Sequence, residues 1–244
     1  MQGIMPNNQP SNSSQSESVR DLFNKRATAW SELYRENQKL VWRLEEFYTS
    51  LAKHVPQPAK VLDFGCGAGN LATCLYVHGY QVTACDIAEK MIAEARQTFV
   101  ATSIEWVNLA TDWRRLPFAD NVFDGVIASS VFEYLEDLDL AFGELARVLR
   151  PGGVLVFSVP NMDHRERKFE QWISRLAAGR WIHGPARSIP QLRNYLDYLR
   201  LSRNRFLPAV WEERAAVHKF HSCGVVRDLS LERPLLLLSL QKVP

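Results

Sequence analysis

The sequence has little of several features that would at once define a class of protein. Its longest aliphatic run spans only residues 235–238, whereas about 20 apolar residues are needed to cross a bilayer, so we expect no transmembrane segment. The 4 cysteines include no C-x-x-C pair and no histidine spaced as a zinc partner, which excludes a disulfide scaffold and predicts no metal site. We therefore expect a protein of the reducing cytoplasm.

The excess of charge is also small. The 29 basic and 27 acidic residues leave a formal charge of +2, which is too little to indicate a nucleic acid as a partner. The remaining composition, with 46% hydrophobic and 23% charged residues in a chain of 244, is typical of one globular α/β domain with a modest insertion.

The N-terminal part of the chain differs from the rest. Residues 1–18 are rich in Asn, Gln and Ser and lack the basic start and apolar middle of a signal peptide, so we predict a disordered tail. In residues 19–55, apolar and aromatic side chains recur mostly at three-, four- and seven-residue steps, which predicts one or two amphipathic helices. The core of the domain then extends over residues 56–244.

Short apolar runs alternate with helical patterns from residue 61 onward. Strands are predicted at 61–64, 80–85, 104–107, 123–128 and 154–159. Such alternation indicates an α/β fold with a parallel sheet. Two closing strands, at 225–231 and 235–240, follow a predicted helix that begins near Pro208 and ends near Ser222.

A glycine-rich turn follows the first predicted strand, with glycines at 65, 67 and 69. Such a turn lets the backbone approach a ligand and presents the N–H groups of the next helix. The spacing G-x-G-x-G is one residue shorter than the G-x-G-x-x-G of dinucleotide enzymes. Asp86 stands 23 residues after Asp63, at the tip of the second strand, where a carboxylate can accept both hydroxyls of a ribose. Because more than one cofactor class requires an acid there, Asp86 alone does not decide between them.

Four ordered motifs carry a resemblance to a known family. They are VLDFGCGAG at 61–69, CDIAEKMI at 85–92, TDWRRLPFADNVFDGVIASSVFEYL at 111–135 and LARVLRPGGVLVFSVP at 145–160. Together they resemble the class I S-adenosylmethionine-dependent methyltransferases of type 11, the subgroup of the ubiquinone/menaquinone-biosynthesis enzymes and many small-molecule methyltransferases. The resemblance implies a Rossmann-like fold with helices on both faces of a seven-stranded, mostly parallel sheet that has one antiparallel strand.

The resemblance also implies S-adenosyl-L-methionine as the cofactor and S-adenosyl-L-homocysteine as the product. It implies that the glycine loop packs against the methionine and ribose, that Asp63 anchors the turn or the ammonium, and that Asp86 binds the ribose hydroxyls. Ser129 and Ser130 are expected to line the path to the sulfonium. The predicted cofactor-binding residues are Asp63, Gly65, Cys66, Gly67, Gly69, Asp86, Ile87, Asp112, Trp113, Ser129 and Ser130.

Three of these residues belong to the adenine side of the site. The resemblance implies that Ile87 flanks the adenine, that Asp112 accepts from its exocyclic amine and that Trp113 lies beside the ring. An ordinary turn acid remains the alternative for Asp112, and packing alone remains the alternative for Trp113. For Cys66 we favour a small residue that fits the loop over a reactive thiol.

Methyl transfer from a sulfonium is an in-line displacement, so the main tasks of the protein are to align the acceptor with the methyl group and to exclude water. A hydroxyl acceptor would need help in losing its proton, whereas an activated carbon or a free amine needs less. The candidates for this catalytic role are Glu133 and Tyr134, directly after the fourth strand, and His164, after the fifth. The sequence thus favours O-, N- or C-methylation of a small molecule such as a metabolite, a sugar or a lipid-like precursor.

Other classes of function stay open beside this one. A methyltransferase acting on RNA or protein is less favoured, because no Asn-Pro-Pro-Tyr-like motif follows the fourth strand. A non-catalytic cofactor-binding module is disfavoured by the intact glycine loop with Asp63 and Asp86. An NAD-dependent oxidoreductase is the remaining alternative.

Two segments outside the motifs have a predicted role. Residues 161–205 hold ten Lys or Arg against four Asp or Glu, and we interpret residues 161–207 as a helical insertion on the acceptor side. A solvated basic face, an anionic acceptor and a peripheral contact with an anionic membrane remain alternatives for this stretch. We interpret residues 19–55 as a lid over the cofactor cleft, with a simple cover for one face of the sheet as the alternative.

Overall fold

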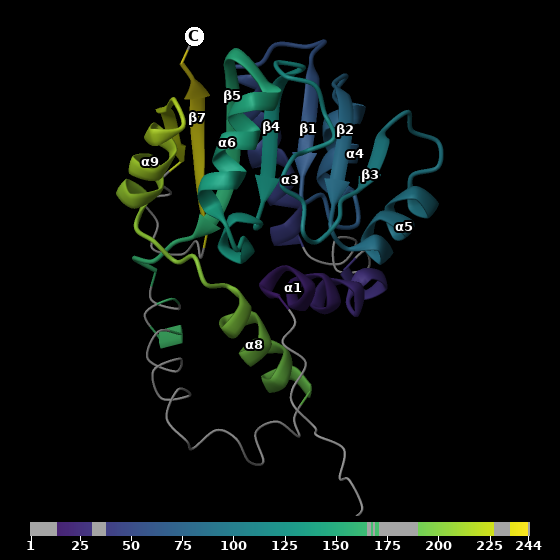
Figure 1. Ribbon diagram of the computed structural model, residues 1–244. Helices are drawn as coiled ribbons and strands as arrows, with labels where there is room; N and C mark the ends of the chain where they lie inside the picture. Colours follow the sequence, from purple (N-terminus) through teal and green to yellow (C-terminus); the bar gives the residue numbers. More distant parts are fainter. Residues whose placement is uncertain are drawn as a thin grey trace, which may run out of the picture.

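The computed structural model describes residues 14–30, 38–164, 167, 169–170, 190–226 and 235–243. Within these ranges, no helix combines the length and the hydropathy that a membrane crossing requires. The centre of the molecule is a sheet with helices packed on it (Figure 1).

The sheet contains seven strands in the order β3-β2-β1-β4-β5-β7-β6. Their bounds are β1 Lys60–Phe64, β2 Gln81–Asp86, β3 Glu105–Asn108, β4 Phe123–Ser129, β5 Leu149–Pro160, β6 Phe220–Val226 and β7 Leu235–Lys242. The pairs from β3 to β5 are parallel, whereas β7 is antiparallel to both β5 and β6. The predicted fold, a mostly parallel seven-stranded sheet with one antiparallel strand, is therefore confirmed.

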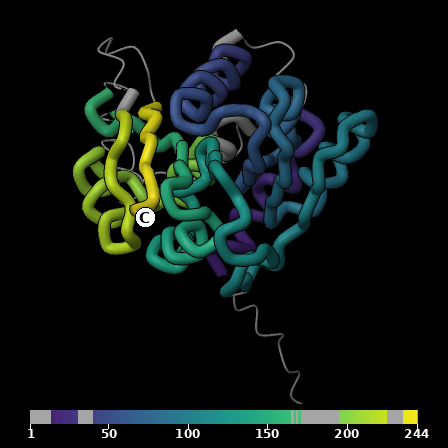
Figure 2. The backbone as a smooth tube through the Cα atoms, turned by 90° about the horizontal axis from the view of Figure 1, so that it is seen from above, coloured from purple at the N-terminus to yellow at the C-terminus, as the bar shows by residue number. Residues whose placement is uncertain are grey.

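Helices cover both faces of this sheet, as the view from above shows (Figure 2). They are α1 Gln15–Asn24, α3 Gln38–Ala52, α4 Asn70–Val77, α5 Glu89–Thr98, α6 Leu138–Val148, α8 Pro190–Leu201 and α9 Pro208–Val217, with the short 3-10 helix η1 Phe132–Tyr134 after β4. On one face, Phe142 of α6 and Trp211 of α9 are fully buried in one cluster. On the other face, Phe47 and Leu51 of α3 pack with Leu75 of α4.

The N-terminal segment divides into two parts with different places. Helix α3 lies on a face of the sheet, where Phe47 and Leu51 are in the core. Helix α1 instead lies near the carboxyl ends of the parallel strands, next to α8 (Figure 1). Residues 19–55 thus contribute to two separate helices, of which α3 covers a face of the sheet.

Helix α1 begins earlier than the sequence analysis placed it. Four residues of the expected tail over 1–18, those from 15 to 18, are helical, because Ser14 and Glu17 form a capping box. The Ser14 Oγ accepts from the Glu17 N–H at 3.2 Å, and the Glu17 carboxylate accepts from the Ser14 N–H at 2.9 Å. Two N–H groups at the helix start are satisfied in this way.

The sixth strand also differs from the prediction. The expected helix extended to about residue 222, but α9 ends at Val217 and β6 begins at Phe220. Lys219, with φ at 64°, makes the turn between them, and the side chain of Phe220 is buried. The apolar run 225–231 alone did not reveal this early start.

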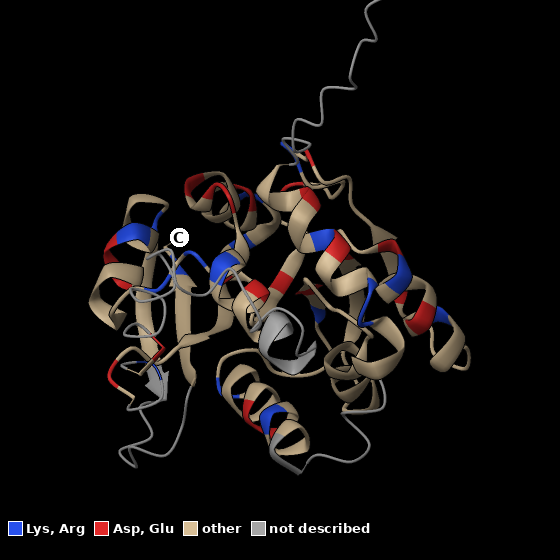
Figure 3. Cartoon of the chain, turned by 90° about the horizontal axis from the view of Figure 1, so that it is seen from below, with Lys and Arg blue, Asp and Glu red and all other residues tan. Residues whose placement is uncertain are grey.

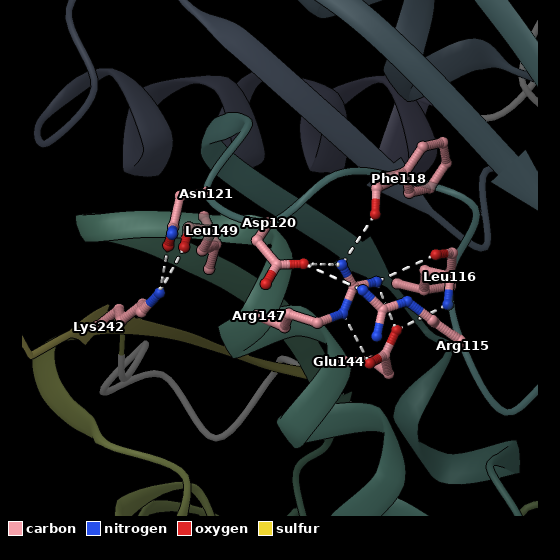
Figure 4. Close-up of polar contacts among 9 residues, drawn as sticks. All are labelled: Arg115, Leu116, Phe118, Asp120, Asn121, Glu144, Arg147, Leu149 and Lys242. Atoms are coloured by element: carbon pink, nitrogen blue, oxygen red, sulfur yellow. Dashed lines mark hydrogen bonds and ion pairs between the residues drawn. The ribbon is translucent and has the colours of Figure 1, made fainter.

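The loop before β4 is held to α6 by the guanidinium of Arg147, as the close-up shows (Figure 4). Arg147 donates to the carbonyl oxygens of Leu116 and Phe118 at 3.0 and 2.8 Å, and it pairs with the carboxylates of Asp120 and Glu144, each at 2.7 Å. Asp120 is therefore a structural acid of this loop.

Candidate functional site

A cavity of about 450 Å³ lies at the carboxyl ends of β1, β2 and β4. Its wall is completed by α1, by the segment around η1 and by residues of α8. Ligands of open α/β sheets bind at this edge, beyond the carboxyl ends of the strands. The cavity has two halves, one formed by the glycine loop and the tips of β1 and β2, and the other by Glu133, Tyr134 and the tyrosines of α8.

The glycine loop has a backbone that only glycine accommodates without strain. Gly65, Gly67 and Gly69 have φ angles of 75°, 53° and 85°. A Cβ atom at Gly65 would overlap the side chain of Val131, and one at Gly69 would lie 2.5 Å from the Cη2 atom of Trp106. Gly65 and Gly67 line the cavity, whereas Gly69 does not and instead precedes α4 as its N-cap.

Cys66 lies between the first two glycines and also lines the cavity. Burial raises the pKa of its thiol well above the ordinary value. A thiol that stays protonated is a poor nucleophile, which agrees with the interpretation of Cys66 as a small residue that fits the loop.

Two acids, Asp63 and Asp86, stand at the tips of β1 and β2. Asp63 is only 1% exposed, and burial, followed by the charge of Asp86, raises its pKa to about 8. Its Oδ2 atom has no hydrogen-bond partner in the described part of the chain. A buried carboxylate oxygen without a partner is costly unless a donor or cation reaches it. Asp63 therefore fits a ligand that brings an ammonium group into this half of the cavity.

The carboxylate of Asp86 is held in place by the backbone. Its Oδ2 accepts from the N–H of Gly67 at 2.9 Å, and its Oδ1 accepts from the N–H of Ala88 at 2.8 Å. Burial raises its pKa, although these two hydrogen bonds act in the opposite direction. The remaining lone pairs of both oxygens can accept from the hydroxyls of a ribose. Asp86 thus holds the glycine loop through Gly67 and also presents its carboxylate at the cavity wall.

The residues predicted for an adenine ring are not all in the same place. Ile87 and Trp113 line the cavity. The Trp113 ring packs edge-on against Phe64, with the ring centres 5.9 Å apart. Trp113 therefore packs against the hydrophobic core and also belongs to the cavity wall. The side chain of Asp112 is exposed and does not line the cavity, because the turn that contains it directs it to the surface.

The second half of the cavity is built on the turn between β4 and α6. Ser129 and Ser130 line the cavity as predicted. Ser130 has a left-handed φ of 56°, and its N–H donates to the Oγ of Ser158 at 2.9 Å. This sharp turn leads into η1, which places Glu133 and Tyr134 on the wall.

Glu133 is buried, with 2% exposure, and its Oε2 has no hydrogen-bond partner. Burial raises its pKa to about 7, while a backbone hydrogen bond and then the positive charges of Arg43, Arg167 and Arg205 act in the opposite direction. A carboxyl group with this pKa exchanges its proton near neutral pH. It therefore has the properties of a general base or acid.

The other two catalytic candidates differ in their location. Tyr134 lines the cavity, and its ring packs edge-on against Phe23 of α1 at 5.4 Å. Burial raises the pKa of its phenol well above the ordinary value. Tyr134 therefore remains protonated, and its role is to form part of the cavity wall. His164 is buried but does not line the cavity. The structure thus brings together Glu133 and Tyr134 and leaves His164 outside.

A buried ion cluster closes the same half of the cavity. Glu170 accepts from Arg167 at 2.5 Å and from Arg205 at 2.9 Å. Arg167 also donates to the hydroxyl of Tyr198 at 3.0 Å, and the guanidinium of Arg205 lies 5.2 Å from the centre of the Tyr198 ring. Arg167 and Glu170 belong to the stretch that we predicted on the acceptor side. Its other basic residues before Arg193, from Arg165 to Arg187, lie outside the described residues.

Sequence reasoning missed Asn204, which holds the η1 turn. Its Nδ2 donates to the carbonyl oxygens of Phe132 and Leu135 at 2.9 and 2.7 Å, and its N–H donates to the carbonyl of Glu133 at 3.1 Å. Three carbonyls of one turn thus depend on a residue about 70 positions away in the chain. No local pattern could have indicated this contact.

The fold and the site define a class of protein. A seven-stranded sheet with an antiparallel β7, a glycine loop after β1 and acids at the tips of β1 and β2 are the features expected of a class I S-adenosylmethionine-dependent methyltransferase.

Comparison with known proteins identifies the family. Residues 62–157 match the family described as "Methyltransferase domain". This stretch is therefore similar to that family, in agreement with the resemblance that the four motifs carry.

Three known proteins illustrate the similarity. A malonyl-[acyl-carrier protein] O-methyltransferase of Geobacter sulfurreducens is 35% identical over 143 residues, 58% of this chain and 52% of the relative. A demethylmenaquinone methyltransferase of Thermus thermophilus is 39% identical over 119 residues, 48% of this chain and 53% of the relative. The chain thus spans about half the length of these relatives. A solved 1,6-didemethyltoxoflavin-N1-methyltransferase of Burkholderia thailandensis shares the fold, with a TM-score of 0.67, 17% identity and coverage of 99% of this chain and 94% of that one.

Proposed function

We propose that this chain transfers a methyl group from S-adenosyl-L-methionine to a small-molecule acceptor, with Glu133 as the general base. The observation that carries the proposal is one continuous cavity that joins two kinds of site. One end holds the glycine loop and the unpartnered carboxylate oxygen of Asp63, and the other holds the unpartnered carboxylate oxygen of Glu133.

The cofactor, when bound, supplies a methyl group on a positively charged sulfur, a good leaving group. Asp63 would hold its ammonium and Asp86 its ribose hydroxyls, while Ile87 and Trp113 would contact the adenine. The N–H groups and close backbone of the glycine loop would hold the methionine part. These residues fit the group because the Oδ2 of Asp63 gains a donor that no described residue supplies, and the free lone pairs of Asp86 can accept from hydroxyls.

The remaining wall residues act on the acceptor. Glu133 would take a proton at its Oε2 atom as the acceptor attacks. Phe23 and Tyr134 exclude water from this half by packing their rings together at 5.4 Å. Alignment of the acceptor with the methyl group inside a dry cavity supplies most of the expected rate gain.

The proposed acceptor is a small molecule and not a nucleic acid. Figure 3 shows Lys and Arg interspersed with Asp and Glu along the described helices on this side of the molecule. The names of the relatives support acceptors that differ widely, from a malonyl group on an acyl-carrier protein to a quinone precursor. The cytoplasmic location stays a prediction.

We also propose that α1 acts as the lid. Ser16, Val19 and Phe23 of α1 line the cavity, whereas Phe47 of α3 belongs to the core. A lid that closes after binding would shield the reacting groups from water.

Calorimetric titration with S-adenosyl-L-homocysteine, and with NAD in parallel, tests the cofactor. We expect binding of the first ligand alone, and we expect Asp63→Asn to weaken it because the ammonium loses its charged partner. Incubation with S-adenosyl-L-methionine and metabolite fractions, followed by mass spectrometry, should then show a product that is heavier by one methyl group. Binding of NAD in place of S-adenosyl-L-homocysteine would contradict the proposal.

A further inference from the structure

Apart from Arg26 and the paired Arg167 and Glu170, two charged groups on the cavity wall remain after the cofactor residues are assigned. One is Glu133, whose buried Oε2 has no partner. The other is Arg43, which reaches the cavity wall from α3. Among the described residues, none forms a hydrogen bond or an ion pair with the Arg43 guanidinium. Both groups therefore retain unused hydrogen-bonding capacity at the cavity wall.

Arg43 differs in this respect from the arginines of the ion cluster. Arg167 and Arg205 both donate to the carboxylate of Glu170, so each of them has a carboxylate partner, which the two share. Arg43 has no such carboxylate partner, and yet its charge acts on Glu133 more strongly than those of Arg167 and Arg205. Arg43 and Glu133 line the same cavity, so a molecule bound there can lie between the guanidinium and the carboxyl.

The chemistry of this pair selects among possible acceptor atoms. A hydroxyl can donate its proton to Glu133 while its oxygen accepts from Arg43. An amine has no use for Arg43, since methylation gives it a positive charge that the guanidinium would repel. An oxygen anion, in contrast, is stabilised by the guanidinium before it attacks.

We propose that the acceptor carries an acidic hydroxyl, a phenol or an enol, whose oxygen lies between the Glu133 carboxyl and the Arg43 guanidinium. The proposal rests on the proposed methyl transfer and names the class of its acceptor. The O–H bond breaks and its proton goes to Oε2 of Glu133. The oxygen then forms a bond to the methyl carbon as the carbon–sulfur bond breaks, and that electron pair stays on sulfur. The rings of Phe23, Tyr134, Tyr195 and Tyr198 on the same wall suit a flat, unsaturated acceptor.

The test uses three probes of similar size with the full-length protein saturated by S-adenosyl-L-homocysteine. They are 4-nitrophenol, 4-nitrobenzyl alcohol and 4-nitrobenzylamine, which present an acidic hydroxyl, a neutral hydroxyl and a cation. We expect 4-nitrophenol to bind most tightly and the amine least tightly. The visible absorbance of nitrophenolate also reports ionisation directly. We expect the bound probe to ionise at a pH about one unit lower than the free probe, which is a tenfold change in its acid constant.

Variants separate the two groups from each other and from general effects. Arg43→Gln should abolish the shift in ionisation and weaken binding of 4-nitrophenol about tenfold, and Arg43→Lys should restore part of both. Glu133→Gln should remove the proton acceptor and leave the order of the probes unchanged. Arg200→Gln, which removes an exposed arginine of α8 outside the cavity wall, is the matched control and should behave as the wild type.

Several results would overturn this proposal. They are equal or tighter binding of the amine, no binding of any probe, or an Arg43→Gln variant with unchanged ionisation of 4-nitrophenol. Binding of S-adenosyl-L-homocysteine, measured first in every variant, distinguishes this failure from failure of the proposed function. A protein that binds S-adenosyl-L-homocysteine but not the phenol refutes only the acceptor class.

Discussion

Replacing Glu133 with glutamine should change how stability depends on pH. Its carboxyl has a pKa of about 7 in the folded protein, above the ordinary value of 4.5, mainly because it is buried. Since the folded pKa is the higher one, the folded protein binds more protons than the unfolded chain between these two values. The wild type therefore loses stability as pH rises from about 4.5 to about 7. At roughly 1.4 kcal/mol per pH unit, the loss amounts to about 3 kcal/mol.

Glu133→Gln keeps the shape of the side chain and removes the ionisable group. We expect the variant to be more stable than the wild type by about 2–3 kcal/mol at pH 8, and the difference to shrink toward zero near pH 4.5. Urea denaturation at several pH values between 5 and 8 measures it. Asp63, whose pKa is about 8, titrates in both proteins, so its contribution cancels in the difference.

The control for this experiment is Glu213→Gln, which removes an exposed carboxylate of α9. It should show no such growth of the stability difference with pH. A Glu133→Gln variant whose stability relative to the wild type is the same at pH 5 and pH 8 would refute the reasoning, because a buried carboxyl that ionises near neutral pH must produce that slope.

Three further predictions concern Asp86, Asn204 and the N-terminal helices. Asp86→Ala should weaken S-adenosyl-L-homocysteine binding by about 1.5–3 kcal/mol in calorimetry. Asp112→Ala, which changes a residue outside the cavity wall, should leave the affinity unchanged. Equal losses of affinity in the two variants would contradict a role of Asp86 in the site. Asn204→Ala should lower the free energy of unfolding by about 1–3 kcal/mol, and Asn204→Asp should lower it more, because a carboxylate would face two carbonyl oxygens; the reverse order in urea denaturation would contradict this. Deletion of residues 1–24 should leave a cooperative thermal unfolding transition but weaken S-adenosyl-L-homocysteine binding. Deletion of residues 1–50 should abolish that transition because Phe47 is in the core. Full binding by the protein that lacks only residues 1–24 would refute the proposal that α1 is a lid.

The geometry of the half of the cavity that we propose for the cofactor was predictable because its signals are local. Glycines at 65, 67 and 69 need positive φ angles for the turn after β1, and the acids at the strand tips follow from the βαβ pattern. Asp112 was the exception. Its neighbour Trp113 reaches the cavity, and a one-residue difference in a turn decides which side chain points inward.

The acceptor half was only partly predictable because its contacts are distant in the chain. Glu133 follows β4, where a site residue is expected, but nothing local indicates that Asn204 holds its turn or that Arg43 lines the same cavity. The start of α1 was predictable in principle, since Ser14 and Glu17 have the spacing of a capping box. His164 shows the opposite case. It follows β5 in the sequence as Glu133 follows β4, and yet its side chain does not line the cavity.

The difference between the two halves has a functional consequence. The cofactor half comes mainly from one stretch of chain, residues 63 to 113, whereas the acceptor half joins α1, α3, η1 and α8. Gln15 of α1 donates to the carbonyl of Leu201 in α8 at 2.7 Å, and Asn204, just after α8, donates to the carbonyl of Leu135 after η1, so α1, α8 and the η1 turn are joined to one another. Substitutions there can change the acceptor without disturbing the glycine loop. Relatives that share the motif-bearing region can therefore act on acceptors as different as those that their names state.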